Sequence, residues 1–544
     1  MKRFLAVLLA GLALALAAPV TAQQSKVLNL AFTQEPDALP SPMYSNMFFS
    51  ALLTPLWNSP VWVYDEALNL IPRLVTEIPS ADNGGISADG TVITLRLRDD
   101  IVWSDGTPIT ADDFIFTYDM FVADSNAVTS RSPYDRVTSV EAPDPRTVVV
   151  TFAEPYAPWQ PNLYNLMLPK HILQPVFDAE GTLDSANFLR QPEVSSGPFV
   201  VTEWNLGNYI LFSRNDNYFD DKAKLDQIYV RFVSDDAQVA ALLNGEADLG
   251  TFFAPDDAVT LEQNGIAVIT VPSGYNEGIF FNFRDIPEHA AIQDLAVRQA
   301  IAYGLNRDGI ARDLLRYGTG DEDYTPIADT YWHNTPWANP AIKHQPYDPD
   351  QARQILEEAG WVDTNGDGIR EKDGLELKLT WASNQRSLRA RVREVGQQQL
   401  REIGIEIEII SLPSDVYFGS YGDGSPVAMG EFDMWEHSNN TAWPDPDVVQ
   451  WTCVEISSDD NPSGVNDQGL CDPELDRLFN EQARTVDFEA RRELYYQIQQ
   501  IIHDNVYWLP MWHDPDLYAL SPRFKNARIA GQTQFWNAAN WDIQ

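Results

Sequence analysis

The chain has 544 residues, of which 44% are hydrophobic and 16 are tryptophan, so it is globular and long enough for two or more domains. It carries 79 acidic and 37 basic side chains, and the resulting net charge of −42 opposes binding to DNA, RNA or anionic lipid headgroups. An acidic surface that favours solubility or suits a saline habitat explains this charge more simply than attraction for a cationic ligand does.

The first residues resemble an export signal. Two basic residues precede an apolar run over residues 4–18, and small residues follow as far as Ala22. This order predicts a secretory signal peptide over residues 1–22, which is too short for a stable membrane anchor. Cleavage there would leave Gln23 at the new terminus, so the lipid anchor that requires a terminal cysteine is not available. We therefore expect a periplasmic protein that is not lipid-anchored through cysteine.

The first half of the remaining chain is predicted to consist mainly of strands. Alternating apolar residues indicate strands at 27–32, 93–97 and 147–152, and a hairpin with strands at 199–204 and 209–212. A helix is expected to follow Ser234 as its N-cap, to carry Val239, Leu242 and Leu243, and to end at Gly245.

One segment of this half combines a strand, a turn and a capped helix. Residues 95–114 read LRLRDDIVWSDGTPITADDF, in which the strand leads into a turn at 105–108. Thr110 with Asp113 three residues later fits a capping box, and Phe114 begins the apolar stripe of the helix. On their own, these local signals predict a structural unit and no particular chemistry.

The second half is predicted to be regular α/β. Its expected helices start after Asp294, run from Asp348 to Gly360, and cover 388–403 and 489–505. Strands at 375–381 and 405–409 flank the third of these helices, which makes a βαβ unit whose two strands should lie parallel. The succession predicts interleaved α/β lobes, and a cleft between lobes is a usual place for a ligand.

The sequence of residues 103–114 resembles the W-S-D-G-T-P-x-T-A-x-D-F signature of the family 5 solute-binding proteins. These proteins deliver oligopeptides, dipeptides, nickel and some sugars to ABC importers. Further segments resemble the same family in the same order: Gly197 to Trp204 with Asn215 and Tyr218, Asn244 to Asp248, Asp294 to Arg307, and Tyr347 to Trp361. Asn306 replaces the usual aspartate in one of them. Because these segments extend over nearly the whole mature chain, the chain is identified as a member of that family.

The resemblance implies an α/β chain with a periplasmic-binding-protein type II fold, in which two lobes clasp the ligand and a third lobe is inserted. It places lobe I at residues 23–56, 197–280 and 510–544, the inserted lobe II at 57–196, and lobe III at 281–509. The ligand is then enclosed between lobes I and III, and the closed form docks on the membrane permease. Ligand binding acts as a population shift toward the closed state.

The resemblance also points to candidate ligand contacts. Residues 435–447 look like the ligand loop of the third lobe, and the contacts predicted there are Trp435, Asn439, Asn440, Trp443 and Asp445. In peptide-binding relatives an aspartate of this loop pairs with the peptide's terminal amine. Ala442 stands at that place here, which leaves Asp445 or Glu436 to supply the charge.

Two further groups of candidates lie near the expected crossings between lobes I and III. Tyr275, Asn276 and Glu277 precede the first crossing strand, and Trp512 lies close to the last one. Ordinary structural packing is the alternative role for all of these residues and for the loop.

A short acidic loop resembles a calcium site. Residues 363–368 read DTNGDG, the start of an EF-hand loop, with Asp363, Asn365 and Asp367 as weak calcium candidates. Because Gly374 stands where such a loop needs a bidentate glutamate, a polar Asx-turn loop is the favoured interpretation. No other metal and no cofactor is predicted.

No catalytic constellation stands out in the sequence. The G-x-S-x-G, H-E-x-x-H, phosphate-loop and dinucleotide motifs are absent, and carboxylates are too abundant for any pair to indicate a glycosidase. Cys453 and Cys471 are expected to form a structural disulfide in an exported chain, because they lack the spacing of a redox or metal motif.

The expected function is that of the substrate-binding component of an ABC importer, which captures an oligopeptide or peptide-like solute and delivers it to permease subunits. We expect a monomer that binds no nucleic acid and is not an enzyme. An oligosaccharide ligand is the alternative within the same class, favoured by the tryptophan content and by Ala442. A secreted glycoside or peptide hydrolase is the remote alternative from a different class.

Overall fold

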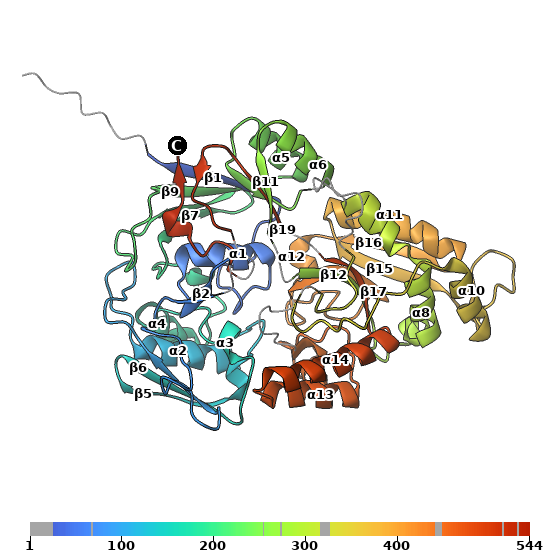
Figure 1. Cartoon of the computed structure of the whole chain (residues 1–544), viewed down its shortest axis with the longest axis horizontal. Helices are drawn as coiled ribbons and strands as arrows, with labels where there is room; N and C mark the ends of the chain where they lie inside the picture. The colour runs from blue at the N-terminus through green and yellow to red at the C-terminus, as the bar shows by residue number, and fades with distance from the viewer. Residues whose placement is uncertain are drawn as a thin grey trace, which may run out of the picture.

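The computed structural model describes residues 25–66, 69–253, 255–271, 275–315, 327–333, 335–440, 449–513, 516–529 and 533–544. Three of its sheets each anchor a body of helices and loops, which we call the seven-stranded, three-stranded and five-stranded bodies after those sheets. Figure 1 shows the first at the upper left, the second at the lower left and the third on the right. None of the helices described is long and apolar enough to cross a bilayer.

The seven-stranded sheet joins both ends of the described chain. Its order is β11-β19-β10-β1-β9-β8-β7. The strands are β1 (Val27–Phe32), β7 (Phe199–Asn205), β8 (Tyr209–Arg214), β9 (Gln227–Phe232), β10 (Leu249–Thr251), β11 (Ala267–Val271) and β19 (Asp516–Leu520). β1 runs parallel to β9 and β10, whereas β19 is antiparallel to β10 and β11. Helices α1 (Phe48–Trp57), α5 (Asp235–Leu243) and α6 (Pro255–Gln263) pack beside this sheet.

The three-stranded body shares its hydrophobic core with the seven-stranded body. Its sheet has the antiparallel order β4-β6-β5. Its elements are β4 (Val92–Arg96), β5 (Val137–Asp144), β6 (Thr147–Phe152), α2 (Ala111–Val122), α3 (Trp159–Asn162) and α4 (Lys170–Glu180), with the small pair β2 (Trp62–Tyr64) and β3 (Leu70–Pro72) alongside. One continuous cluster of buried side chains extends from Leu28 on β1 to Val150 on β6, so no solvent layer separates the two bodies.

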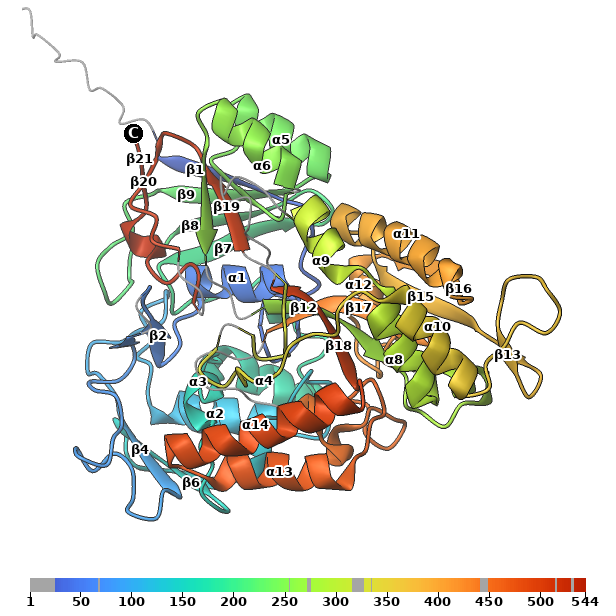
Figure 2. The same cartoon turned by 45° about the vertical axis from the view of Figure 1, so that its right-hand side comes forward.

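The five-stranded body is a sheet covered by helices on both faces (Figure 2). Its order is β16-β15-β17-β12-β18, with strands β12 (Tyr275–Phe281), β15 (Lys378–Asn384), β16 (Glu406–Leu412), β17 (Met434–Asn440) and β18 (Trp508–His513). Helices α8 (Leu295–Gly304), α10 (Pro349–Glu358) and α11 (Ser387–Glu402) bury one core, and α13 (Pro473–Arg484) and α14 (Phe488–Asp504) bury the other.

Short elements complete the chain. They are α7 (Ala290–Gln293), α9 (Arg307–Ile310), α12 (Ser414–Tyr417), the hairpin of β13 (Glu371–Lys372) with β14 (Leu375–Glu376), and the pair β20 (Phe524–Lys525) with β21 (Asp542–Ile543). The lobe boundaries given above stay a prediction.

The predicted βαβ unit and the predicted disulfide are both confirmed. β15 and β16 are parallel and in register from Lys378 opposite Glu406 to Asn384 opposite Leu412, with α11 between them in the chain. Cys453 and Cys471 are joined by a disulfide, with their Cα atoms 4.7 Å apart.

Two local predictions are wrong in detail. The strand expected over 375–381 is split, because Leu375 and Glu376 pair with β13 in a tight hairpin, whereas the residues from Lys378 onward pair with β16. At α5, Ser234 is the N-cap residue as predicted, but its side chain makes no capping hydrogen bond.

Asp113 holds two backbone segments in the three-stranded body. Its carboxylate accepts hydrogen bonds from the amides of Thr110, 2.9 Å away, and Lys170, 3.1 Å away, and its side chain is buried. The first bond belongs to the predicted capping box at the start of α2, and the second fixes the first residue of α4. The signature segment is therefore a structural junction.

We predict that Asp113→Ala destabilises the protein by about 1–3 kcal/mol for each of the two donors that it leaves unpaired. Asp112→Ala is the matched control, since the neighbouring Asp112 side chain is 70% exposed and should contribute less than about 1 kcal/mol. Urea unfolding followed by tryptophan fluorescence measures both changes, and equal losses in the two variants would contradict the role assigned to Asp113.

Candidate functional site

A cleft lies between the seven-stranded and five-stranded bodies. Its wide part has a volume of about 810 Å³ and its narrow inner part about 70 Å³. Gln34, Phe252 and Arg386 line both parts, so the two parts adjoin each other. Walls from two separate bodies make this space the natural place for a ligand that binds as the bodies close.

The wide part of the cleft is lined by many charged side chains. Its charged lining residues are Glu35, Asp37, Asp235, Asp236, Asp257 and Asp415, together with Arg190 and Arg386. Several of the carboxylates already accept hydrogen bonds from the protein. Glu35, for example, accepts from the Trp204 indole at 2.6 Å and from the Gly207 amide at 2.9 Å. The polar wall is therefore partly fixed in place by its own contacts.

The narrow part is more aromatic. Phe48 and Phe252 line it from the seven-stranded body, and Tyr275, Phe418 and Arg389 line it from the five-stranded body. The ring centroids of Phe48 and Tyr275 lie 5.7 Å apart across it. Rings on both walls provide flat apolar surfaces beside polar groups, a combination typical of small-molecule sites.

The two bodies already touch at this cleft. The Ser387 hydroxyl donates to a carboxylate oxygen of Asp235 at 2.7 Å, and the Arg386 guanidinium lies 4.8 Å from the centroid of the Phe252 ring. Both contacts join the start of α11 to the seven-stranded body. The structure therefore represents a closed arrangement of the two bodies.

A buried ion pair supports the floor of the narrow part. Arg389 donates to both carboxylate oxygens of Glu277, at 2.7 and 2.9 Å, and to the Asn384 side-chain oxygen at 3.0 Å. The Ser438 hydroxyl donates to the same carboxylate at 2.7 Å. Because Glu277 is fully buried and Arg389 is 4% exposed, this pair ties β12, α11 and β17 together with little screening by solvent.

Two titratable groups of β17 are kept neutral beside this pair. Glu436 is fully buried, and neither of its carboxylate oxygens has a hydrogen-bond partner within the described part of the chain. Burial, and then the charge of Glu277, raise the pKa of Glu436 well above its ordinary value. Burial lowers the pKa of His437 to about 3, and the positive charge of Arg389 adds to this effect.

Of the residues predicted at the first crossing, only Tyr275 lines the cleft. The Asn276 side chain donates to the carbonyl oxygens of Tyr331 at 2.9 Å and His333 at 3.2 Å, on the opposite face of the sheet. Glu277 does not line the cleft, but its carboxylate binds the guanidinium of Arg389, which does. Neighbouring side chains of a strand alternate between faces, so three consecutive residues could not all point into one space.

The two tryptophans of the prediction are core residues. Trp435 is 1% exposed and packs among the side chains beneath α13 and α14, and Trp512 is fully buried in the core beneath α8 and α11. Both are removed from the candidate site, because tertiary packing already covers their rings.

The structure describes only two of the four remaining predicted contacts. Asn439 is half-buried on β17, and the backbone of Asn440 pairs with Tyr275. Trp443 and Asp445 lie outside the described residues. Glu436, weighed above as the source of a negative charge for the ligand, is buried behind the Glu277–Arg389 pair and is held neutral there.

The acidic loop at 363–368 uses its oxygens internally. The Asp363 carboxylate accepts from the amides of Gly366 at 2.7 Å and Gly368 at 2.9 Å, and Asn365 and Asp367 each accept from an amide two residues later at 2.8 Å. Such bonds are those of Asx turns. Across the described ranges, no three His, Cys, Asp or Glu side chains gather as a metal site would need.

Sequence reasoning missed most of the cleft wall. Asn384 is the last residue of β15 and residues 385–387 follow it, and Pro413 to Asp415 follow the end of β16. These two strands are parallel, and ligands commonly bind outside the carboxyl ends of parallel strands. The predicted βαβ unit could therefore have identified these two loops, whereas Gln34, Phe48 and Phe252 carry no such signal.

Known proteins match this chain over most of its length. A family model described as bacterial extracellular solute-binding proteins, family 5 Middle, matches residues 69–460. The oligopeptide-binding protein AppA of Bacillus subtilis is 33% identical over 358 residues, which make up 63% of this chain and 61% of that protein, so this match spans less than two thirds of the relative. The nickel-binding periplasmic protein of Escherichia coli is 27% identical over 82% of each chain.

Solved structures share the fold. AppA from Bacillus subtilis in complex with a nonapeptide matches with a TM-score of 0.83 and 24% identity, over 96% of this chain and 99% of that chain. An oligopeptide-binding protein from Thermus thermophilus complexed with a pentapeptide matches with a TM-score of 0.84 and 23% identity, over 96% of each chain. These matches confirm the expected periplasmic-binding-protein type II fold.

We predict that the free energy of unfolding of Glu436→Gln, measured relative to that of the parent, increases as the pH rises from about 5 to about 8. The raised pKa of Glu436 means that the folded protein keeps a proton that the unfolded chain releases above about pH 4.3. The protonated Glu436 therefore makes its full contribution to the stability of the parent below that pH. This contribution is lost as the pH rises toward the folded-state pKa, whereas glutamine cannot ionise.

Urea unfolding at a series of pH values measures this difference. Glu431→Gln is the control, because Glu431 is exposed just before the same strand and should give a difference that does not change with pH. A pH-independent difference for Glu436→Gln as well would contradict the neutral state of Glu436.

Proposed function

Because the chain belongs to family 5 of the bacterial extracellular solute-binding proteins, we propose that it captures an oligopeptide or peptide-like solute in the cleft between the seven-stranded and five-stranded bodies. It then delivers this solute to the permease subunits of an ABC importer. The protein acts in the periplasm, without a cysteine-linked lipid anchor, as a monomer that binds no nucleic acid. It releases the solute chemically unchanged.

The composition of the cleft wall is the observation that supports a peptide-like ligand. A peptide presents amides, charged ends and apolar side chains together. The cleft offers the amide of Gln34, the charges of Arg386 and several carboxylates, and the rings of its narrow part. A volume of about 810 Å³ in the wide part lies within the common range of small-molecule sites.

The oligosaccharide alternative loses its main support. That alternative relied on tryptophan rings for stacking on sugars, but Trp435 and Trp512 belong to the cores. Within the described ranges, the rings that line the cleft are those of Phe48, Phe252, Tyr275 and Phe418. We therefore retain a single class of ligand.

Isothermal titration calorimetry tests the proposal with a panel of peptides from two to nine residues and a matched panel of oligosaccharides. We expect one peptide site per chain and intact peptide on recovery, as judged by mass spectrometry. Binding of oligosaccharides without peptides would overturn the assignment of the ligand, and hydrolysed peptide would overturn the assignment as a receptor.

We predict that Arg386→Ala weakens peptide binding by about 5- to 30-fold. Arg386 lines both parts of the cleft and stacks over Phe252 from the opposite wall. Alanine would lose both this stacking contact and the contact with the ligand, which together contribute about 1–2 kcal/mol to the free energy of binding. Arg401→Ala is the matched control, because Arg401 lies in the last turn of α11 with a 48% exposed side chain and does not line the cleft. Equal affinities of the two variants in calorimetry would contradict this role of Arg386.

A further inference from the structure

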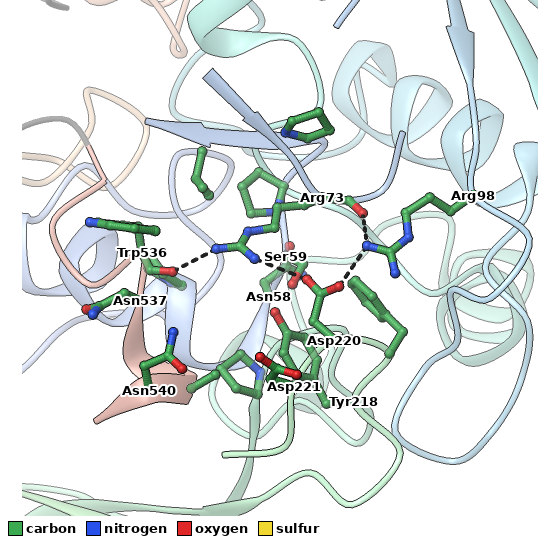
Figure 3. Close-up of a pocket in the computed structure, with 17 residues that line it drawn as sticks. Asn58, Ser59, Arg73, Arg98, Tyr218, Asp220, Asp221, Trp536, Asn537 and Asn540 are labelled. Carbon is green, nitrogen blue, oxygen red and sulfur yellow. Dashed lines mark hydrogen bonds and ion pairs between the residues drawn. The ribbon is translucent and has the colours of Figure 1, made fainter. Parts of the chain in front are cut away.

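The three-stranded body is fixed to the seven-stranded body by more than a shared core. Asp220, after β8, accepts from Arg73 at 3.1 Å and from Arg98 at 2.7 Å, and Arg73 also donates to the Trp536 carbonyl oxygen at 3.2 Å (Figure 3). These groups line a cavity of about 570 Å³ where the two bodies and the C-terminal segment meet. Because Asp220 is already paired with Arg73 and Arg98, these charged groups hold the two bodies together at the cavity.

The same three-stranded body also reaches the five-stranded body. The amide of Ala157, between β6 and α3, donates to the carbonyl oxygen of Ala483 at 2.7 Å. Next to this bond, Arg484 forms an ion pair with Glu154 at 2.7 Å. Ala483 and Arg484 are the last two residues of α13, so the end of this helix is the point of contact.

Ala483 is built into the core of the other two bodies. It is 4% exposed and belongs to the hydrophobic cluster that the seven-stranded and three-stranded bodies share. In the described part of the chain, it is the only member of that cluster that comes from the five-stranded body. A buried side chain and a backbone hydrogen bond distinguish this contact from a chance approach of two surfaces.

This contact and the contact at the ligand cleft lie at opposite ends of the interface. Figure 1 shows α5 and the start of α11 near the top, and α3 and the end of α13 near the bottom. The chain passes between the seven-stranded and five-stranded sheets twice, between β11 and β12 and between β18 and β19. Because the seven-stranded and three-stranded bodies share one core, a rotation of the five-stranded body about these two crossings changes both the width of the cleft and the distance from the end of α13 to the three-stranded body.

We propose that Glu154 and Ala157 with Ala483 and Arg484 form a closing latch, through which the three-stranded body strengthens ligand capture without touching the ligand. This inference rests on the proposed function of the cleft. A contact that exists only in the closed state raises the closed fraction, and the apparent dissociation constant is inversely proportional to that fraction. The four residues are positioning residues for ligand capture.

Charge reversal tests the latch. Glu154→Arg and Arg484→Glu each place like charges together, so each should raise the Kd for peptide by about three- to tenfold, mainly through faster dissociation. The double variant restores opposite charges and should return to within about twofold of the parent. A merely structural role would not give this rescue, and thermal unfolding should show similar midpoints for all four proteins.

Glu474→Arg is the matched control. Glu474 and Arg477 form an exposed ion pair at 2.7 Å on the same helix α13, and among the described residues neither side chain is linked to another body by an ion pair. Its reversal should leave the Kd unchanged. An equal effect of Glu474→Arg and Arg484→Glu, or the absence of rescue in the double variant, would overturn the latch.

A second measurement does not depend on the ligand. Spin labels on cysteines introduced at Leu206 and Val416, which are 58% and 40% exposed on the two sides of the cleft, report the closed fraction by their distance distribution. Both single reversals should shift this distribution to longer distances, and the double variant should restore it. If no peptide binds the parent, the proposed function fails while this test still decides the latch, and unchanged distributions in both single variants would overturn it.

Discussion

The pairing of β19 with β10 and β11 is the constraint on which the rest of the structure depends. It places Leu520 opposite both Leu249 and Ala267, so a segment near the end of the chain completes a sheet that begins with β1. Because the chain must return to this sheet, the five-stranded body is held by two connections. Two connections permit rotation of that body but prevent its separation, and a cleft with walls from both sides is the consequence.

Charge is distributed so that the floor of this cleft stays rigid while its walls stay polar. The Glu277–Arg389 pair is buried and saturated by Ser438 and Asn384, and loss of either partner would leave a buried charge, at a cost of about 3–5 kcal/mol. Glu436 next to it is kept neutral, which avoids a second negative charge in the same place. The polar groups of the wide part remain at the surface, where a solute can meet them.

The sequence predicted local structure well and the cleft poorly. The Thr110–Asp113 capping box, the βαβ unit and the disulfide each depend on residues close in the chain or on a chemical pairing rule. Phe252 and Arg386 meet only because two sheets approach each other, and no local pattern encodes that approach. Trp435 was misplaced because a large aromatic ring suits a core as well as a ligand site.

The shared core of the seven-stranded and three-stranded bodies also limits when the protein can fold. That core contains Leu28 from the start of the described chain, and Phe535 and Trp541 from its end. The two bodies cannot complete this core until the last residues have been made, so folding during synthesis stays incomplete and contacts form over long chain separations. A core that is completed only by the final residues is suited to a chain that passes through a narrow translocation channel before it folds, the route that its predicted signal peptide specifies.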